Sequence, residues 1–355
     1  MFINILNINI DIFKKYINKL EKKKFCADQI LRWIYKYNIR NFNEMTNISK
    51  KIKRKMNMLF YISIPNIINK KISNDGVIKW LMGFNNKNYF ETVLIIKNYK
   101  ATLCISSQIG CIIKCLFCYT GSLGFKKNLN ISEIIGQLLQ VKHELKYNNF
   151  FYFIKNINIT NIVFMGMGEP LLNFKNVLAT LKIITNINLF AISKKHIILS
   201  TSGIIPMIKK LSLECPVSLA ISLHASNNKL RNKLVPINKK YSLKKLLKSC
   251  KNYIKYSPKK NITFEYCMLN KINDYKYHAY EILKLIYNKK KKKMLNCKFN
   301  LIPFNIFPKT NFKSSSENRI KKFANILIKA GIITTIRKTK GFSINASCGQ
   351  LIGKL

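Results

Sequence analysis

Short apolar runs alternate with amphipathic segments between residues 100 and 339, and this alternation constrains the fold more than any other feature of the chain. Strands are predicted at the run TLCIS and over residues 161–167, 196–201, 217–224, 261–269, 297–305 and 332–339. Helices are predicted over 131–146, 174–185, around Met207, and over 242–256, 275–287 and 316–330. Apolar strands separated by such helices form parallel sheets, so about six units predict an α/β fold with a partial (β/α)6 barrel. The sheet is too short to close as eight strands do, and we expect an open side that admits a macromolecule.

A cysteine-rich stretch follows the first of these strands. Four of the ten cysteines lie in ATLCISSQIGCIIKCLFCYTGSLGF, residues 101–125, and Cys111, Cys115 and Cys118 have the spacing C-x3-C-x2-C. Thiolates bind iron–sulfur clusters, and a cubane cluster has four irons, so three cysteines leave one iron open for chemistry. A structural zinc site usually has two ligand pairs, and no second pair is found here. A chance cluster of cysteines in a compositionally biased chain is the alternative reading.

Two segments precede the barrel. Residues 1–62 are predicted to form a small helical domain, with Ser49 as the N-cap of the segment 50–60. Its FCADQILRWIY segment places four apolar side chains near one helix face, namely Phe25, Ile30, Trp33 and Ile34. Residues 63–99 contain β-branched and aromatic runs and predict an antiparallel β extension. The barrel then occupies residues 100–345, where Asn130 and Glu133 predict a capping box for the first helix, and 346–355 form a C-terminal segment.

The chain carries 63 lysine and arginine residues against 14 acidic ones, a formal net charge of +49. Such a charge attracts polyanions, of which nucleic acid is the natural candidate. Only six of the basic residues are arginine, however, and lysine, asparagine and isoleucine are abundant throughout, as codon drift in an AT-rich genome produces. The charge is therefore weak support for RNA binding, and the lysine run at 289–293 is predicted to be a solvated loop.

No apolar run approaches the roughly 20 residues that cross a bilayer. The N-terminus MFINILNINIDIF lacks an early basic region and a small-residue cleavage site. Ten irregularly spaced cysteines fit a reducing compartment. We expect a soluble, cytoplasmic protein with no membrane partner.

Polar residues gather at the ends of the predicted strands, where (β/α) barrels carry their working residues. The strand 161–167 runs into MGMGEP, in which glycines let a ligand approach the backbone and Glu169 could bind an ammonium group. The other strand ends supply the sequences STSG from Ser200, Ser222-Leu223-His224, and IPFN ending in Asn305. Each signal is weak by itself, because a lone histidine is more often a core residue. Together they predict a ligand site on one rim.

Several of these segments resemble the RlmN family of adenine-C2 RNA methyltransferases, a radical S-adenosylmethionine (SAM) family that also includes the Cfr resistance enzymes. The resemblance rests on MGMGEPLLN, STSG, AISLHA, FEYCML, NLIPFN and ASCGQL, with FCADQILRWIY and NFNEMTNISK in the N-terminal domain. It implies that Cys111, Cys115 and Cys118 hold a [4Fe–4S] cluster whose open iron chelates SAM. The residues that it implies contact SAM are Gly168, Glu169, Ser200, Ser222, Leu223, His224 and Asn305.

The resemblance also implies three catalytic residues. Adenine C2 is an electron-poor sp2 carbon that cannot attack a methyl group as a nucleophile, so a radical route is needed. Cys348 is implied to accept a methyl group from one SAM, which the radical from a second SAM activates for addition to C2. Cys104 is implied to attack Cys348, forming a disulfide and releasing the base, and Glu91 to take the C2 proton. From the residues alone, Cys348 is equally a small buried apolar residue and Glu91 an exposed salt-bridging carboxylate.

The predicted function is therefore methylation of adenine C2 in 23S rRNA and, by resemblance, in tRNA. The resemblance further implies an electron donor such as flavodoxin with its reductase, and a monomer. Two alternatives stay open: Cfr-type methylation at C8, and a non-catalytic RNA-binding protein whose cluster is structural. Two residues depart from the family pattern, Tyr119 where a small residue is usual and Ser343 where aspartate is common. The five remaining cysteines are interpreted as packing residues, namely Cys26, Cys215, Cys250, Cys267 and Cys297.

Overall fold

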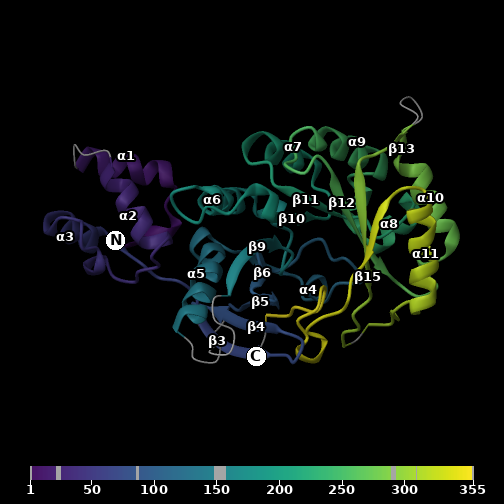
Figure 1. The fold of residues 1–355 in the computed structure, drawn as a ribbon, viewed down its shortest axis with the longest axis horizontal. Coiled ribbons are helices and arrows are strands. Elements are labelled where there is room, and N and C mark those ends of the chain that lie inside the picture. Colours follow the sequence, from purple (N-terminus) through teal and green to yellow (C-terminus); the bar gives the residue numbers. More distant parts are fainter. Residues whose placement is uncertain are drawn as a thin grey trace.

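A computed structural model describes residues 2–20, 25–84, 88–147, 157–288, 293–308 and 310–353. A small helical domain lies beside a larger α/β body (Figure 1). Its helices are α1 (Ile10–Leu20), α2 (Phe25–Tyr35) and α3 (Lys50–Leu59). The short strands β1 (Ile3–Asn4) and β2 (Phe60–Tyr61) pair in parallel, so the start of this domain is tied to its end. The predicted helical character of the segment is confirmed.

The predicted apolar face of α2 packs into the interior of the helical domain, except for one of its residues. Ile30 and Ile34 are buried, but Phe25 is 56% exposed. Phe25 is the first described residue of this helix, and its exposure shows that its predicted place on the buried face is wrong. The Ser49 hydroxyl accepts a hydrogen bond from the Ile52 amide, and the predicted N-cap is confirmed.

One ten-stranded sheet runs through the larger body in the order β16-β15-β12-β11-β10-β9-β6-β5-β4-β3. The strands β3 (Asn66–Ile72), β4 (Val77–Gly83) and β5 (Phe90–Lys97) form the predicted antiparallel extension, and β5 also pairs antiparallel with β6 (Lys100–Cys104), the predicted first barrel strand. From β6 onward the pairing is parallel, through β9 (Asn158–Phe164), β10 (Ile197–Thr201), β11 (Ser218–Ser222), β12 (Ile262–Met268), β15 (Cys297–Pro303) and β16 (Ile333–Ile336). The sheet is open, because β3 and β16 are its two edges, and the predicted partial barrel is confirmed.

Helices connect successive parallel strands and pack on the sheet (Figure 1). They are α5 (Ile131–Tyr147), α6 (Phe174–Thr185), α7 (Ile205–Glu214), α9 (Leu243–Ile254), α10 (Lys276–Ile286) and α11 (Glu317–Lys329). At the start of α5 the Asn130 side chain accepts from the Glu133 amide, and the Glu133 carboxylate accepts from the Asn130 amide. The predicted capping box is thus confirmed. Within the described residues, no helix is long and apolar enough to cross a membrane.

Several short elements have no counterpart in the prediction. They are α4 (Tyr119–Ser122), α8 (Asn228–Leu234), the hairpin of β7 (Gln108–Gly110) with β8 (Phe125–Asn128), and the hairpin of β13 (Tyr287–Asn288) with β14 (Lys293–Met294). Each is too short to show a hydrophobic period. The lysine run predicted as a loop lies, except for Lys293, outside the described residues.

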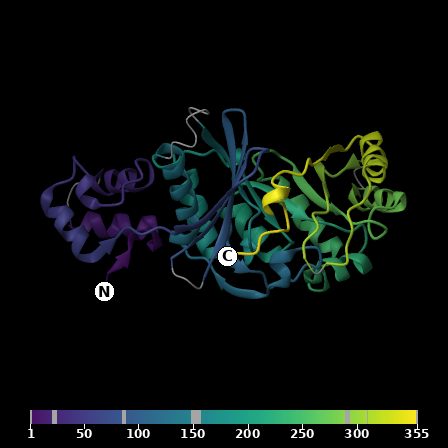
Figure 2. The ribbon, with the colours of Figure 1, turned by 90° about the horizontal axis from the view of Figure 1, so that it is seen from below.

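After β16 the chain returns across the sheet as a C-terminal strap, residues 340–352. Figure 2 shows it passing between the antiparallel extension and the C-terminal strands of the barrel. The hydrogen bonds that hold it there include Gly341 N to Asp75 Oδ2 (2.8 Å), Lys79 Nζ to Asn345 O (3.1 Å), Thr120 Oγ1 to Leu351 O (2.7 Å) and Ile352 N to Glu91 Oε2 (2.7 Å). The extension and the barrel therefore both fix the segment that carries Cys348.

Candidate active site

The cysteine loop begins directly after the β7 strand and is shaped by its own backbone. The Cys111 amide donates to Gly124 O at 2.9 Å, and the Cys118 amide donates to Cys115 O at 3.1 Å. All three thiols of the motif are half-buried and line one cavity of about 170 Å³. Burial raises the pKa of Cys111 to about 12 and also raises the pKa values of Cys115 and Cys118. The neighbouring thiols add to the shift at Cys115, so the three groups are close enough to repel as anions.

Gly110 holds the entry to this loop with φ +73°, a conformation that strains other residues. A Cβ atom there would lie 1.8 Å from Gly124 O, the acceptor for Cys111. We expect Gly110→Ala to lower the free energy of unfolding by more than about 3 kcal/mol, because the clash adds to backbone strain. The loss is measured by urea unfolding of the cluster-free protein, and iron content should fall in parallel.

Gly124→Ala is the matched control. Gly124 has φ +72° but nothing lies within 4 Å of the added Cβ, so only strain of about 1–2 kcal/mol is expected. Equal losses for the two variants would contradict the proposed clash.

Glu169 lies at the rim of the same cavity and is 4% exposed. Its Oε2 accepts from the Ser202 amide and hydroxyl, both at 2.7 Å, and its Oε1 accepts from the Leu171 amide at 3.1 Å. Burial raises the pKa of this carboxyl group despite these hydrogen bonds. No lysine or arginine forms an ion pair with it in the described part of the chain. A buried carboxylate without a cation is suited to receive an ammonium group from a ligand.

The His224 ring is oriented by a hydrogen bond that one of its two nitrogens accepts. Its φ is +55°, and its ring contacts Phe117 of the cysteine loop, with centroids 4.3 Å apart. The Cys267 amide donates to Nδ1 at 2.9 Å, so Nε2 carries the proton. Burial lowers the pKa of His224 to about 3, with a further contribution from Arg231. The imidazole is therefore neutral and can donate one hydrogen bond into the cavity.

The other predicted SAM contacts fall into two groups. Gly168, Ser200, Ser222 and Asn305 line the cavity with the three cysteines, and so do Glu169 and His224. Leu223 does not line it, because its side chain is fully buried and its backbone amide donates to Glu265 O. Cys267, interpreted as a packing residue, does line the cavity, although it is only 6% exposed.

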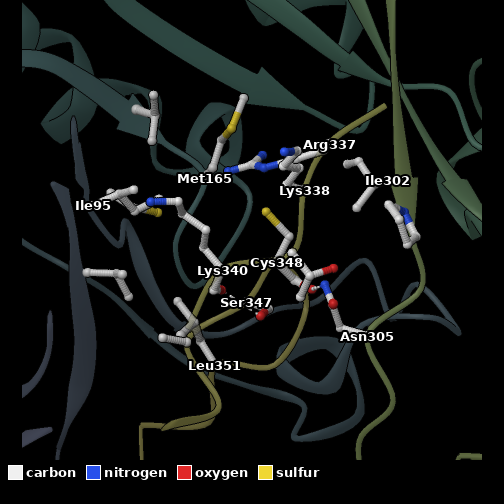
Figure 3. A pocket seen from close by; sticks show the side chains of 16 residues that line it. Ile95, Met165, Ile302, Asn305, Arg337, Lys338, Lys340, Ser347, Cys348 and Leu351 are labelled. Atoms are coloured by element: carbon white, nitrogen blue, oxygen red, sulfur yellow. Dashed lines mark hydrogen bonds between the residues drawn. The ribbon is translucent and has the colours of Figure 1, made fainter. Parts of the chain in front are cut away.

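A second cavity, of about 140 Å³, adjoins the first and contains both Cys104 and Cys348. Cys348 lines both cavities. Its side chain points toward Arg337 and Met165, while Asn305 lies beside its backbone (Figure 3). The Asn305 amide donates to Cys348 O at 3.1 Å. Burial raises the pKa of Cys104 to about 12, and Cys348 adds to this rise, so the two thiols interact across the cavity.

Glu91 has a different environment from the one expected for an exposed carboxylate. It is 2% exposed, and its Oε1 pairs with Lys79 Nζ at 2.8 Å. Its Oε2 accepts from the Ile352 amide of the strap at 2.7 Å. The expected salt bridge is present but buried, because β4 and β5 place both residues under the strap. Glu91 lines neither of the two cavities.

Two arginines at the site were missed by sequence reasoning. Arg337 lines both cavities, and Arg231 lies buried behind the residues that follow β10 and β11. Their rarity was the available signal, because only six of the 63 basic residues are arginine. Arginine offers a planar fork of donors that lysine lacks, so it is needed where several oxygens must be held at once.

The donor set fits a multi-iron cluster better than a single ion. No three His, Cys, Asp or Glu side chains among the described residues could hold one metal ion. A cubane presents its irons at separate corners, so its ligands need to line one cavity without converging on one point. Three half-buried thiols around one cavity, beside a buried carboxylate without a cation, meet that requirement.

Comparison with known proteins identifies the family. The sequence model of the "Ribosomal RNA large subunit methyltransferase N-terminal domain" matches residues 3–62, and that of the "Radical SAM superfamily" matches residues 105–281. The chain is 48% identical to the "Dual-specificity RNA methyltransferase RlmN" of Buchnera aphidicola subsp. Baizongia pistaciae (strain Bp), over 99% of this chain and 92% of that protein. The chain belongs to the RlmN family. RlmN proteins are radical SAM enzymes, so the cofactors here are a [4Fe–4S] cluster and SAM.

A solved structure agrees with this membership. The crystal structure of a radical SAM methyltransferase from Sphaerobacter thermophilus superposes with a TM-score of 0.88 at 30% identity, covering 99% of this chain and all of that one. One departure from the RlmN pattern is also resolved by the fold. The Tyr119 ring stacks on Phe307 with centroids 5.0 Å apart and lies outside the cavity lining, so it does not crowd the cysteine loop.

Proposed function

We propose that this chain methylates C2 of adenine in 23S rRNA and in tRNA by a radical SAM mechanism. One observation carries the proposal: Cys348 lies where the cavity of the three motif cysteines meets the cavity that contains Cys104. A thiol at this junction can receive a group on one side and deliver it on the other. The RlmN relative and the matching N-terminal domain model support an RNA substrate, and the radical SAM model supports the radical chemistry.

Seven residues that line the two cavities have a proposed task. When bound, the cluster and SAM supply a methyl group and a carbon-centred radical. Cys111, Cys115 and Cys118 hold the cluster, while Glu169 and the Nε2–H of His224 bind polar groups of SAM. Cys348 carries the methyl group as a thioether. Cys104 then attacks the Cys348 sulfur, so that a disulfide forms as the bond from that sulfur to the methylated base breaks.

The N-terminal domain is proposed to contact the folded RNA. Helix α3 carries five basic residues in its first six positions, and it contains no acidic residue. Lys50, Lys51 and Arg54 are exposed, so they can reach phosphate groups. The same domain is matched by the ribosomal RNA methyltransferase N-terminal model.

The proposal also extends to partners and compartment. The proposed electron donor is an acidic protein of the flavodoxin type, with its reductase. The formal net charge of +49 on this chain would attract such a partner. We infer that the chain works as a monomer, since its own C-terminal strap completes both cavities. No disulfide bond joins any of the ten cysteines, all of which the structure describes, and this supports a cytoplasmic, reducing location.

The test is anaerobic reconstitution with iron and sulfide, followed by incubation with SAM, a reductant and an rRNA fragment. We expect 5'-deoxyadenosine together with 2-methyladenine in the digested RNA. Mass spectrometry with authentic standards separates 2-methyladenine from 8-methyladenine. Formation of 8-methyladenine would replace the C2 assignment by a Cfr-type activity, and absence of any methylation would contradict both.

Glu169→Gln tests the proposed SAM contact. The amide keeps the shape of the side chain but removes the buried negative charge, so we expect SAM to bind roughly 10 to 100 times more weakly, as for a lost charge-assisted hydrogen bond. Equilibrium dialysis with the cluster-loaded protein measures the dissociation constant. Glu281→Gln is the control, because Glu281 is bonded to Ser226 and Asn227 and lies outside the cavity. Unchanged SAM affinity in Glu169→Gln would contradict the contact.

A further inference from the structure

Arg231 is a buried cation whose hydrogen-bond partners are all neutral. Its side chain projects from α8 and is 0% exposed. Its guanidinium donates to four oxygens: Leu223 O (3.0 Å), Ser222 O (2.8 Å), Ser202 O (2.7 Å) and Asn238 Oδ1 (3.0 Å). All four of these hydrogen bonds go to carbonyl oxygens.

No carboxylate in the described residues forms an ion pair with Arg231. A buried charge is ordinarily compensated by an opposite charge, because burial removes the solvation that water provides. The acidic groups that act on Arg231 are the thiols of Cys115 and Cys250. Of these, Cys115 belongs to the cluster motif, and as a cluster ligand it is a thiolate. The missing counter-charge of Arg231 is thus supplied when the cluster is present.

The helix that carries Arg231 is also joined to the cysteine loop through its backbone. The amide of Leu116, the residue after Cys115, donates to Leu234 O at 3.2 Å. On its other side the guanidinium holds carbonyl groups just beyond β10 and at the end of β11, where Ser202 binds Glu169 and Ser222 lines the cavity. One side chain therefore connects the SAM-binding turns with the cluster loop.

We propose that Arg231 is a positioning residue that balances the negative charge of the cluster-bound thiolates and holds the SAM-binding turns in register with the cysteine loop. This inference rests on the cofactors of the family and not on the identity of the methylated base. Its test uses no RNA. The inference can therefore fail while the proposed function stands, and the proposed function can fail while the inference stands.

The positive charge of Arg231 should raise the reduction potential of the cluster. A [4Fe–4S] cluster with three thiolates carries one more negative charge when reduced than when oxidised. A fixed positive charge in a region of low dielectric constant therefore favours the reduced form. Removing it lowers the reduction potential. We expect at least a tenfold change in the reduction equilibrium, which is about 59 mV for one electron.

Arg231→Gln and Arg231→Lys separate the two roles. The glutamine variant is neutral and keeps a donor, so we expect the potential of the SAM-free cluster to fall by the amount above. The lysine variant keeps the charge but cannot reach four oxygens with one ammonium group, so its potential should stay at the wild-type value while SAM binds at least tenfold more weakly. Redox titration followed by electron paramagnetic resonance measures the first quantity, and equilibrium dialysis measures the second.

Asn238→Asp provides a test that leaves Arg231 in place. The new carboxylate would lie where Asn238 Oδ1 now accepts from Arg231 at 3.0 Å, and it would cancel the positive charge. The reduction potential should fall by the amount expected for Arg231→Gln. This test therefore remains available if Arg231→Gln does not fold. Lys233→Met is the matched control, because it removes an exposed positive charge from the same helix and should leave the potential unchanged.

A merely structural arginine would give a different pattern. If Arg231 were only structural, Arg231→Gln would lower the thermal midpoint equally with and without the cluster. Charge balance predicts instead that Arg231→Gln loses more stability in the cluster-loaded protein than in the cluster-free one. An unchanged potential in Asn238→Asp, or in a folded and loaded Arg231→Gln, overturns the charge role. Wild-type SAM affinity in Arg231→Lys overturns the positioning role.

Discussion

Cys348→Ala is expected to abolish methylation, by at least about a thousandfold, while RNA binding stays at the wild-type level. The reason is that Cys348 lies at the junction of the two cavities, and no other described thiol lines both. Alanine removes the sulfur that is proposed to carry the methyl group, without leaving a large void. Methylated adenine per RNA is counted by mass spectrometry, and RNA affinity is measured by a gel-shift titration.

Cys267→Ala is the control for that experiment. Cys267 lines the cavity of the cluster motif and is equally a cysteine, but it does not line the cavity of Cys104. Its amide donates to His224 Nδ1, and alanine retains that amide. We expect methylation near the wild-type rate. Persistent methylation in Cys348→Ala, or its loss in Cys267→Ala, would refute the proposed role of Cys348.

Glu91→Gln is expected to trap a covalent adduct between the protein and its RNA, because the proposed base that removes the C2 proton is lost. Turnover should fall by about 10² to 10⁴, the usual contribution of a positioned base. The adduct is detected as a slowly migrating band in denaturing gels that disappears on RNase treatment. Rapid turnover without an adduct would contradict the assignment of Glu91 as the base.

The buried ion pair complicates this variant and supplies its control. Glu91→Gln leaves Lys79 buried and unpaired, and breaking such a pair lowers the free energy of unfolding by about 3–5 kcal/mol. Lys79→Met leaves Glu91 unpaired instead and should lower stability similarly, but it keeps the carboxylate. We therefore expect no adduct with Lys79→Met. An adduct in both variants would show that it arises from a displaced strap and not from a missing base.

Helices and strands were predicted correctly where the segment was long enough to show a hydrophobic period. Helix α6 begins and ends at the predicted residues, and the capping box at the start of α5 is formed as expected. These features depend on side chains within a few positions of one another, so they are written in the local sequence. Helix α8 was missed because seven residues give less than two turns of periodic pattern.

The chain by itself determined the alternation of strands and helices, the cysteine motif and the polar strand ends, and family resemblance assigned them tasks. Only the tertiary structure decided that Glu91 is buried against Lys79, that Leu223 faces the core, and that Arg231 gathers carbonyl groups from two strand ends. The physical reason is range. A helical period or a metal-ligand spacing is fixed by neighbours along the chain, whereas burial, charge compensation and the meeting of Cys104 with Cys348 depend on segments that only packing brings together.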